Sequence, residues 1–224
     1  MSRLFPPIDK SGLGDQVYLA ISKSLASGAL KPGTRLTIRS LAEQMGVSVT
    51  PVRDAVLRLV QDGGLVFRGP RDIRVPVIDQ DRYMEIRRIR MELEGLGAQT
   101  AAERRTPADI AMLEELVAAN EKALLEGDTA TAISLNQQFH FSLLQIADMP
   151  LLQEIVRRLW LQMGPVISAA YQQGGRVMIS CHYDILNAIR DGNGARARAA
   201  IQRDLAEGGD IILSANVLGP EAAP

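Results

Sequence analysis

The hydrophobic residues in the first third of the chain recur every three to four positions in three short stretches, which predicts three helices. The first stretch spans residues 13–25. The second begins after a threonine cap at Thr37 and ends at Gly46. The third opens at Thr50, a threonine cap followed directly by proline, and ends at residues 62–64. Three short helices separated by turns indicate a small helical domain.

Two short apolar runs follow the third helix, at residues 65–67 and 73–77, and the turn-forming sequence RGPRD separates them. Another turn, built on a Pro-Gly pair, occupies residues 29–36 between the first two helices. Helix, helix, short turn, helix and hairpin follow one another in the order of a winged helix-turn-helix. We therefore expect this fold over residues 1–78.

Beyond residue 79 the strand pattern disappears, and the hydrophobic spacing predicts six consecutive helices separated by Gly, Pro and Asp residues. The predicted helices span residues 80–104, 107–126, 129–147, 150–171, 176–190 and 194–217. The predicted fold class is therefore mainly α, with an N-terminal winged helix-turn-helix and a C-terminal all-α helical bundle of about six helices. The bundle occupies residues 79–218, and residues 219–224 form a tail.

Charge is divided unevenly between the two predicted domains. Residues 1–79 carry 11 Lys and Arg against 7 Asp and Glu, and the remainder carries 14 against 19. The resulting net charges of +4 and −5 give the formal charge of −1 for the whole chain. A basic segment joined to an acidic one fits a module that binds a polyanion such as nucleic acid, coupled to a second module.

The chain contains one cysteine, Cys181, which excludes an intramolecular disulfide and a zinc cluster built from cysteines. No stretch reaches the roughly 18 apolar residues of a membrane span, and the first residues lack the apolar core of a signal peptide. We therefore expect a cytoplasmic protein that makes no contact with a membrane.

Candidate DNA contacts lie around the start of the third helix, because a helix-turn-helix inserts its second helix into the major groove. Ser48 and Thr50 could donate hydrogen bonds to phosphates, and Arg53 could reach a phosphate or a guanine edge. Arg39 begins the preceding helix and should lie near the DNA backbone. The alternative is a small helical subdomain with scattered arginines.

The run from GALKPGTRL to LAEQMGVSVTPVRDAVLRLVQDGGLV resembles the signature of the GntR family of transcription regulators over residues 13–75. The resemblance implies operator binding by a winged helix-turn-helix, but two positions depart from the family pattern. Val49 stands where the family commonly has a DNA-contacting arginine. The wing tip is usually rich in glycine; here Gly69 remains, and Arg71 could insert into the minor groove.

Four polar residues interrupt the apolar faces of the later helices: Asn136, His140, His182 and Asp204. Buried polar groups need partners, and an amide, two imidazoles and a carboxylate that face inward could satisfy one another through a metal ion. The alternative is that each is a separately satisfied polar group of the core or of its edge.

Residues 82–213 resemble the FCD effector domain of the FadR-type subgroup, and six helices suggest its VanR-like branch. The metal-binding pattern of that domain falls on Asn136, His140, His182 and Asp204, where one amide and one carboxylate replace the usual carboxylate and third histidine. The resemblance therefore implies a weakened site for a divalent ion such as zinc, nickel or manganese.

The same resemblance implies a small organic acid as effector, bound near the metal. Arg90 and Glu94 match the R-x-x-L-E opening of the domain, and Arg90 could pair with the carboxylate of the acid. The alternative for Arg90 is a surface charge, on a helix that also carries Arg87 and Arg88.

The predicted function is a ligand-responsive transcription regulator, a repressor, that binds double-stranded palindromic operator DNA as a homodimer. The main alternative is a metal-dependent hydrolase that uses His140, His182 and Asp204, but no nucleophile or HExxH-type motif accompanies these residues. We therefore expect no enzymatic activity. A second alternative is a ligand sensor that no longer binds DNA well, because of Val49 and the unusual wing.

Overall fold

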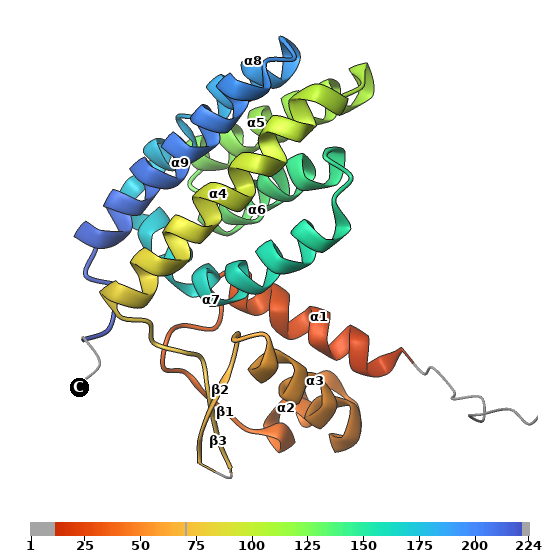
Figure 1. The fold of residues 1–224 in the computed structure, drawn as a ribbon. Helices are drawn as coiled ribbons and strands as arrows, with labels where there is room; N and C mark the ends of the chain where they lie inside the picture. Colours follow the sequence, from red (N-terminus) through yellow and green to blue (C-terminus); the bar gives the residue numbers. More distant parts are fainter. Residues whose placement is uncertain (1–11, 70, 221–224) are drawn as a thin grey trace, which may run out of the picture.

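The computed structural model describes residues 12–69 and 71–220, and within them it confirms the predicted fold class (Figure 1). The predicted tail therefore lies largely outside the described residues. The N-terminal elements are α1 (Leu13–Ala26), β1 (Arg35–Leu36), α2 (Ile38–Met45), α3 (Val49–Gln61), β2 (Val66–Gly69) and β3 (Asp72–Arg74). The remaining elements are α4 (Gln80–Arg104), α5 (Pro107–Leu125), α6 (Thr129–Ile146), α7 (Pro150–Gly174), η1 (Gly175–Ile179), α8 (His182–Arg190) and α9 (Gly194–Ser214).

The N-terminal domain begins and ends its helices largely where local signals place them. The Thr37 hydroxyl caps α2 by accepting a hydrogen bond from the backbone N–H of Ser40, and α2 ends at Gly46, whose φ of 64° suits glycine. The predicted cap of α3 at Thr50 is wrong. That helix already begins at Val49, with Ser48 at the N-cap and no side-chain capping bond.

A three-stranded antiparallel sheet in the order β1-β3-β2 forms the wing and its base. The strand β1 lies inside the segment predicted as a turn. It has only two residues, which is too short to show alternation between buried and exposed positions. The second predicted run, 73–77, is a strand only up to Arg74.

In the C-terminal domain the largest difference from the prediction concerns the helix expected over residues 176–190. Gly174 ends α7, and Gly175 adopts a φ of 50°. The chain then forms the 3₁₀ turn η1, and α8 starts only at His182. The interruption follows from the Gly-Gly pair, which favours neither continuation of α7 nor an immediate new helix.

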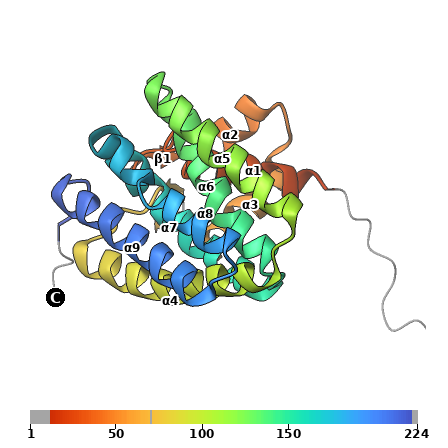
Figure 2. The same ribbon diagram turned by 90° about the horizontal axis from the view of Figure 1, so that it is seen from above.

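The helices of the C-terminal domain surround a common interior. Figures 1 and 2 show α4 and α9 side by side along one face, with α5, α6, α7 and α8 completing the bundle. Most of the side chains that fill the interior are apolar, and they include Leu113, Phe139, Leu143, Val156, Trp160, Met163, Ile167, Ile185, Ile189 and Ile201.

Helix α7 joins the two domains. Leu161 packs into the hydrophobic core of the winged domain, and the Ser168 hydroxyl donates to the carbonyl of Ser27 at 3.2 Å. A Cβ atom on Gly164 would lie 2.7 Å from the Cα of Ala26, so only glycine permits this approach. The other side of α7 carries Trp160 into the interior of the bundle. One helix therefore touches both the winged domain and the core of the C-terminal domain.

Among the described residues, no helix is both long enough and apolar enough to cross a lipid bilayer.

Candidate functional site

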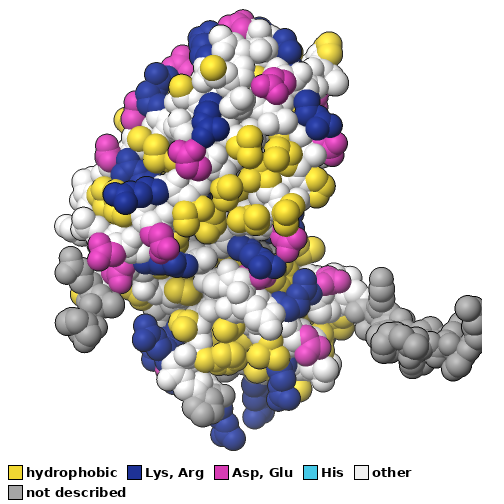
Figure 3. Space-filling view, in the orientation of Figure 1, with side chains coloured by type: hydrophobic (Ala, Val, Ile, Leu, Met, Phe, Trp, Pro, Cys, Tyr) yellow, Lys and Arg dark blue, Asp and Glu magenta, His cyan; other side chains and the backbone are white. Residues whose placement is uncertain are grey.

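A basic groove runs between α2, α3 and the wing. Four arginines line it together with the apolar side chains of Leu57 and Phe67; they are Arg35, Arg39, Arg53 and Arg71. Figure 3 shows Lys and Arg side chains gathered at the end of the molecule where Figure 1 places the wing and these two helices. This is the geometry that a winged helix-turn-helix presents to the negatively charged backbone and the groove of DNA.

The structure brings most of the predicted DNA contacts to this end. Arg39, Arg53 and Arg71 line the same groove, and Ser48 and Thr50 are exposed at the start of α3. Gly69 lies at the end of β2, beside an irregularity in the pairing with β3. Sequence reasoning missed Arg35, because β1 has too few residues to show a strand pattern.

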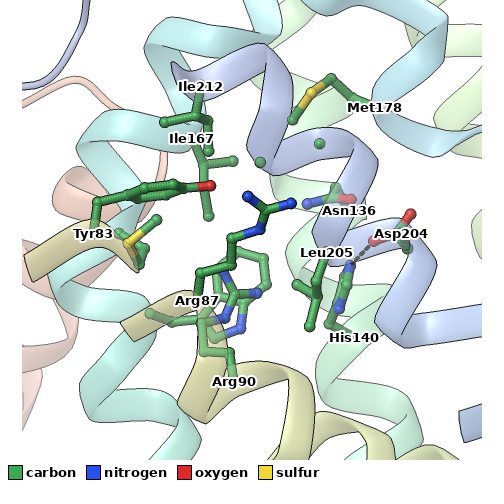
Figure 4. A pocket seen from close by; sticks show the side chains of 14 residues that line it. Tyr83, Arg87, Arg90, Asn136, His140, Ile167, Met178, Asp204, Leu205 and Ile212 are labelled. Carbon is green, nitrogen blue, oxygen red and sulfur yellow. Dashed lines mark ion pairs between the residues drawn. The ribbon is translucent and has the colours of Figure 1, made fainter. Parts of the chain in front are cut away.

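A second candidate site is a small cavity inside the C-terminal domain, bounded by α4, α6, α7 and α9 and by Met178 of η1 (Figure 4). It leaves about 40 Å³ for the centre of a water-sized molecule. A cavity needs roughly 10–15 Å³ of such space to hold one water, so this one has room for a few waters or for an ion with a small ligand. The lining residues are Tyr83, Arg87, Arg90, Asn136, His140, Trp160, Met163, Ile167, Met178, Asp204, Leu205, Gly208, Gly209 and Ile212.

Three of the four predicted metal ligands meet beside this cavity. One ligand atom from each of His140, His182 and Asp204 lies within 4.8 Å of the others, and all three side chains are buried. Asp204 is 3.4 Å from His140 Nε2 and 3.7 Å from His182 Nε2. Asn136, one turn before His140 on α6, lines the same cavity. The structure thus assembles the predicted residues from α6, α8 and α9.

The donor set fits a divalent ion. His182 is fully buried, and neither of its ring nitrogens has a hydrogen-bond partner in the described protein. Two imidazole nitrogens and a carboxylate oxygen are typical ligands of zinc and of neighbouring transition metals. An ion would satisfy the nitrogen of His182 that faces Asp204 without requiring a change of fold.

Glu94 organises one side of this cluster. Its carboxylate accepts hydrogen bonds from Arg90 Nε at 2.6 Å, from His140 Nδ1 at 2.7 Å and from Trp160 Nε1 at 3.2 Å. The bond to Nδ1 directs His140 Nε2 toward Asp204. The sequence indicated Glu94 only as part of a motif, and its role as the partner of His140 was missed.

The charges of these groups depend on one another. Burial alone would raise the pKa of Glu94, but the charge of Arg90 and the hydrogen bond from His140 lower it to about 2. Burial would likewise lower the pKa of His140, but hydrogen bonds to Asp204 and Glu94 raise it to about 9. Burial lowers the pKa of His182 to about 4. At neutral pH without an ion, His140 is thus protonated on both ring nitrogens, with its Nδ1–H directed at Glu94 and its Nε2–H at Asp204.

Arg90 is not a surface charge. Its side chain is buried, paired with Glu94, and stacked on the indole of Trp160 with 4.4 Å between the guanidinium carbon and the ring centre. It also lines the cavity, where the sequence predicted it.

Comparison with known proteins supports the assignment of both domains. Residues 13–75 match the model of the bacterial regulatory proteins of the gntR family, and residues 85–207 match the FCD domain. The HTH-type transcriptional regulator McbR of Escherichia coli (strain K12) is 40% identical over 157 residues, which are 70% of this chain and 71% of that protein. A regulator of Bacillus subtilis (strain 168), YdhC, is 32% identical over 56% of each chain.

Solved structures show the same architecture. The structure of E. coli McbR/YncC has a TM-score of 0.85 and 33% identity, and it covers 90% of this chain and 97% of that one. A GntR regulator from Rhodococcus sp. RHA1, with a TM-score of 0.77 and 19% identity, shares the fold over 91% of this chain and 99% of that one. None of these matches tests the predicted VanR-like branch.

McbR, YdhC and the E. coli protein RspR are all named as transcriptional regulators or repressors, which argues against a metal-dependent hydrolase. The two family matches place a winged helix-turn-helix before an FCD domain, in the order that the structure shows. The basic groove lies on the first of these domains, where DNA would bind. This chain is therefore a DNA-binding transcription regulator that belongs to the GntR family and carries an FCD domain.

Proposed function

We propose that this regulator is a cytoplasmic repressor that binds a palindromic operator as a homodimer and responds to a small organic acid in the cavity of its FCD domain. The observation that carries the proposal is the position of α7 between the two candidate sites. Trp160 and Met163 face the cavity, while Leu161 and Gly164 contact the winged domain. An acid that binds one arrangement of α7 better than another would shift the winged domain with it.

The proposed effector site contains a divalent ion, either zinc, nickel or manganese, held by His140, His182 and Asp204 with Asn136 beside them. Such an ion, when bound, supplies positive charge to a carboxylate ligand. Asn136 is a neutral amide, so the ion is held less tightly than by a second carboxylate. Arg90 stays a predicted contact of the acid, through the part of its guanidinium that does not bind Glu94.

Replacing Arg53 by Ala should weaken binding to operator DNA about ten- to hundred-fold, because one bidentate contact to a base edge contributes about 1–3 kcal/mol. Arg53 is exposed on α3 and lines the basic groove. The measurement is fluorescence anisotropy of labelled DNA from the flank of the chain's own gene, at several salt concentrations. Random DNA of the same length serves as the reference.

Lys31→Ala is the matched control for Arg53, since it removes one positive charge from the same domain outside the groove. It should change affinity much less and equally for both DNAs. If the wild type did not prefer the flanking DNA at any salt concentration, operator binding at that site would be refuted. If only the Lys31 variant lost the preference for the flanking DNA, the surface that recognises the DNA sequence would lie outside α3.

The proposed dimer interface is an apolar face on the C-terminal domain. Ile89 and Leu96 of α4 and Leu151 and Ile155 of α7 are exposed, and Figure 3 shows hydrophobic side chains gathered over the middle of α4 and the start of α7. Soluble monomers rarely expose a contiguous apolar patch of this kind. A second copy of the chain would cover it and double the length of DNA that is read.

Leu96→Glu should convert the dimer into a monomer at micromolar concentration, because it places a charge in an apolar interface. Light scattering after gel filtration gives the mass. The control is Leu125→Glu at the end of α5, where the native leucine is 80% exposed and lies outside this face. A wild type that is already monomeric, or a dimer unaffected by Leu96→Glu, would contradict the proposed interface.

A further inference from the structure

Three apolar side chains form the floor of the basic groove between α2, α3 and the wing. They are Ile38 of α2, Leu57 of α3 and Phe67 of β2. Leu57 is 45% exposed and Phe67 is 40% exposed, whereas Ile38 is half-buried. Figure 3 shows hydrophobic side chains gathered at the lower end of the molecule, where Figure 1 places the wing and α3. Single exposed apolar residues are common on protein surfaces, but here three different elements contribute to one patch.

This apolar floor continues the hydrophobic core of the winged domain. Val56 of α3 and Ile73 of β3 line the same groove, and both belong to that core. Phe67 is the partner of Ile73 in the sheet, so the two side chains lie on the same face of the wing. Leu57 lies one turn after Arg53, on the same face of α3. The core therefore reaches the surface in this groove.

The rim of the groove is basic, because it carries Arg35, Arg39, Arg53 and Arg71. Arg35 lies 3.3 Å from the carboxylate of Asp72, and Arg39 lies 3.0 Å from that of Glu43. Both arginine side chains stay largely exposed in these ion pairs, so the pairs are weak and a phosphate can compete for the guanidinium groups. The groove thus suits an occupant that has an apolar surface flanked by anionic groups.

One strand of DNA has this alternation, because each deoxyribose carries C–H groups and lies between two phosphates. A single sugar–phosphate strand separates the major groove, which α3 enters, from the adjacent minor groove, which the wing approaches. That strand must therefore pass between α3 and the wing, over the apolar floor. Ribose fits the floor less well, since its 2′-hydroxyl would be buried there without a hydrogen-bond partner.

We propose that Phe67 and Leu57 pack against a deoxyribose of this strand while Arg35 binds a neighbouring phosphate. A phosphate contact releases counterions, so its contribution to binding falls as the salt concentration rises. An apolar contact releases none, and its contribution is independent of salt in this range. The two kinds of contact can therefore be distinguished by measurement, and neither depends on the base sequence.

The test is binding of the full-length protein to a random-sequence DNA duplex, measured by fluorescence anisotropy at several salt concentrations. We expect Phe67→Ala to weaken binding about ten-fold at every salt concentration, because the exposed part of the ring no longer leaves water. The slope of log affinity against log salt should not change. Arg35→Gln should instead make this slope shallower by about one phosphate contact. The matched control is Leu19→Ala, since Leu19 is 60% exposed on α1, outside the groove.

Two further variants separate the sugar contact from the stability of the wing. Phe67→Leu keeps an apolar side chain on β2 and should retain most of the affinity. Leu57→Ala leaves the wing unchanged, because Leu57 lies on α3, and it should weaken binding in the same salt-independent way. Thermal unfolding of each variant verifies that the domain is folded before binding is measured.

Two results would overturn the proposal. The first is wild-type affinity in both Phe67→Ala and Leu57→Ala, and the second is a loss of affinity that appears only at low salt. A wild type that fails to bind random DNA even at low salt would also overturn it, and would count against this groove as the DNA interface. The duplex is random and no acid is added, so failure of the proposed palindromic operator or of the proposed acid response would leave this result unaffected.

Discussion

Replacing Glu94 by Gln is expected to lower the free energy of unfolding by about 3–5 kcal/mol, the range for removing one partner from a buried ion pair. The Glu94 and Arg90 side chains are both buried, and their carboxylate and guanidinium meet at 2.6 Å. Glutamine has the same shape but no charge, so it leaves the Arg90 guanidinium buried without its counter-ion. Urea denaturation of the metal-free protein measures the change.

Glu92→Gln is the control for this prediction. Glu92 lies on the same helix, and its ion pair with Arg198 is exposed, so its loss should cost less than about 1 kcal/mol. Equal stability of the Glu94 and Glu92 variants would mean that the ion pair of Arg90 contributes nothing net. Such a result would mean that water reaches the Arg90 guanidinium and replaces its contact with Glu94.

The pH dependence of the Glu94 effect has a defined sign. The pKa of Glu94 falls from 4.5 to about 2 on folding, so the stability that its ionised form contributes is complete above pH 4.5. That contribution is lost as the pH falls from 4.5 toward 2, where the carboxyl group becomes protonated. The difference between wild type and Glu94→Gln should therefore shrink over the same interval.

Local signals in the sequence were sufficient to predict the architecture. The Thr37 cap, the left-handed Gly46 and the helical spacing of apolar residues each act within one or two helical turns, so they can be read without knowledge of the fold. The exceptions are short elements. The two-residue strand β1 is too short to show an alternating hydrophobic pattern. The 3₁₀ turn η1 replaces the start of a predicted helix because Gly174 and Gly175 interrupt the helix there.

The site could be predicted only in part. His140, His182 and Asp204 were recognisable because each interrupts an apolar face, and the structure brings them within 4.8 Å of one another. The role of Glu94 was not recognisable, because its partner His140 lies 46 residues later and no local pattern links them. The close approach of Tyr83 and Arg87 to Gly209 is likewise a contact between α4 and α9 that only the packed bundle reveals.

His182→Phe is expected to remove metal binding while leaving the metal-free protein folded. The ring of His182 stacks on Phe139 with 4.2 Å between the ring centres, an arrangement that a phenyl ring can keep. Its two nitrogens have no hydrogen-bond partner in the described protein, so replacing them removes unsatisfied polar atoms from the core. The metal-free variant should therefore be at least as stable as the wild type.

Addition of Zn²⁺ should stabilise the wild type much more than the His182→Phe variant. Loss of a direct ligand should weaken Zn²⁺ binding by more than the roughly 10–100-fold that loss of a ligand's hydrogen-bond partner costs. Wild type at a Zn²⁺ concentration of 100 Kd should gain about 2.7 kcal/mol of stability, and the variant should gain little. Isothermal titration calorimetry and thermal unfolding with and without Zn²⁺ measure both quantities, with Tyr183→Phe as the neighbouring aromatic control.

The comparison distinguishes a metal site from a self-sufficient polar core. If His182 serves only the core, the variant should lose stability without Zn²⁺ and the wild type should gain none with it. If His182 is a ligand, the variant should be the more stable protein without Zn²⁺ and the wild type the more stable protein with it. The reason is that the unsatisfied nitrogen of His182 destabilises the metal-free site but binds the ion when it is present. The buried imidazole, unpaired beside a carboxylate, favours the second result.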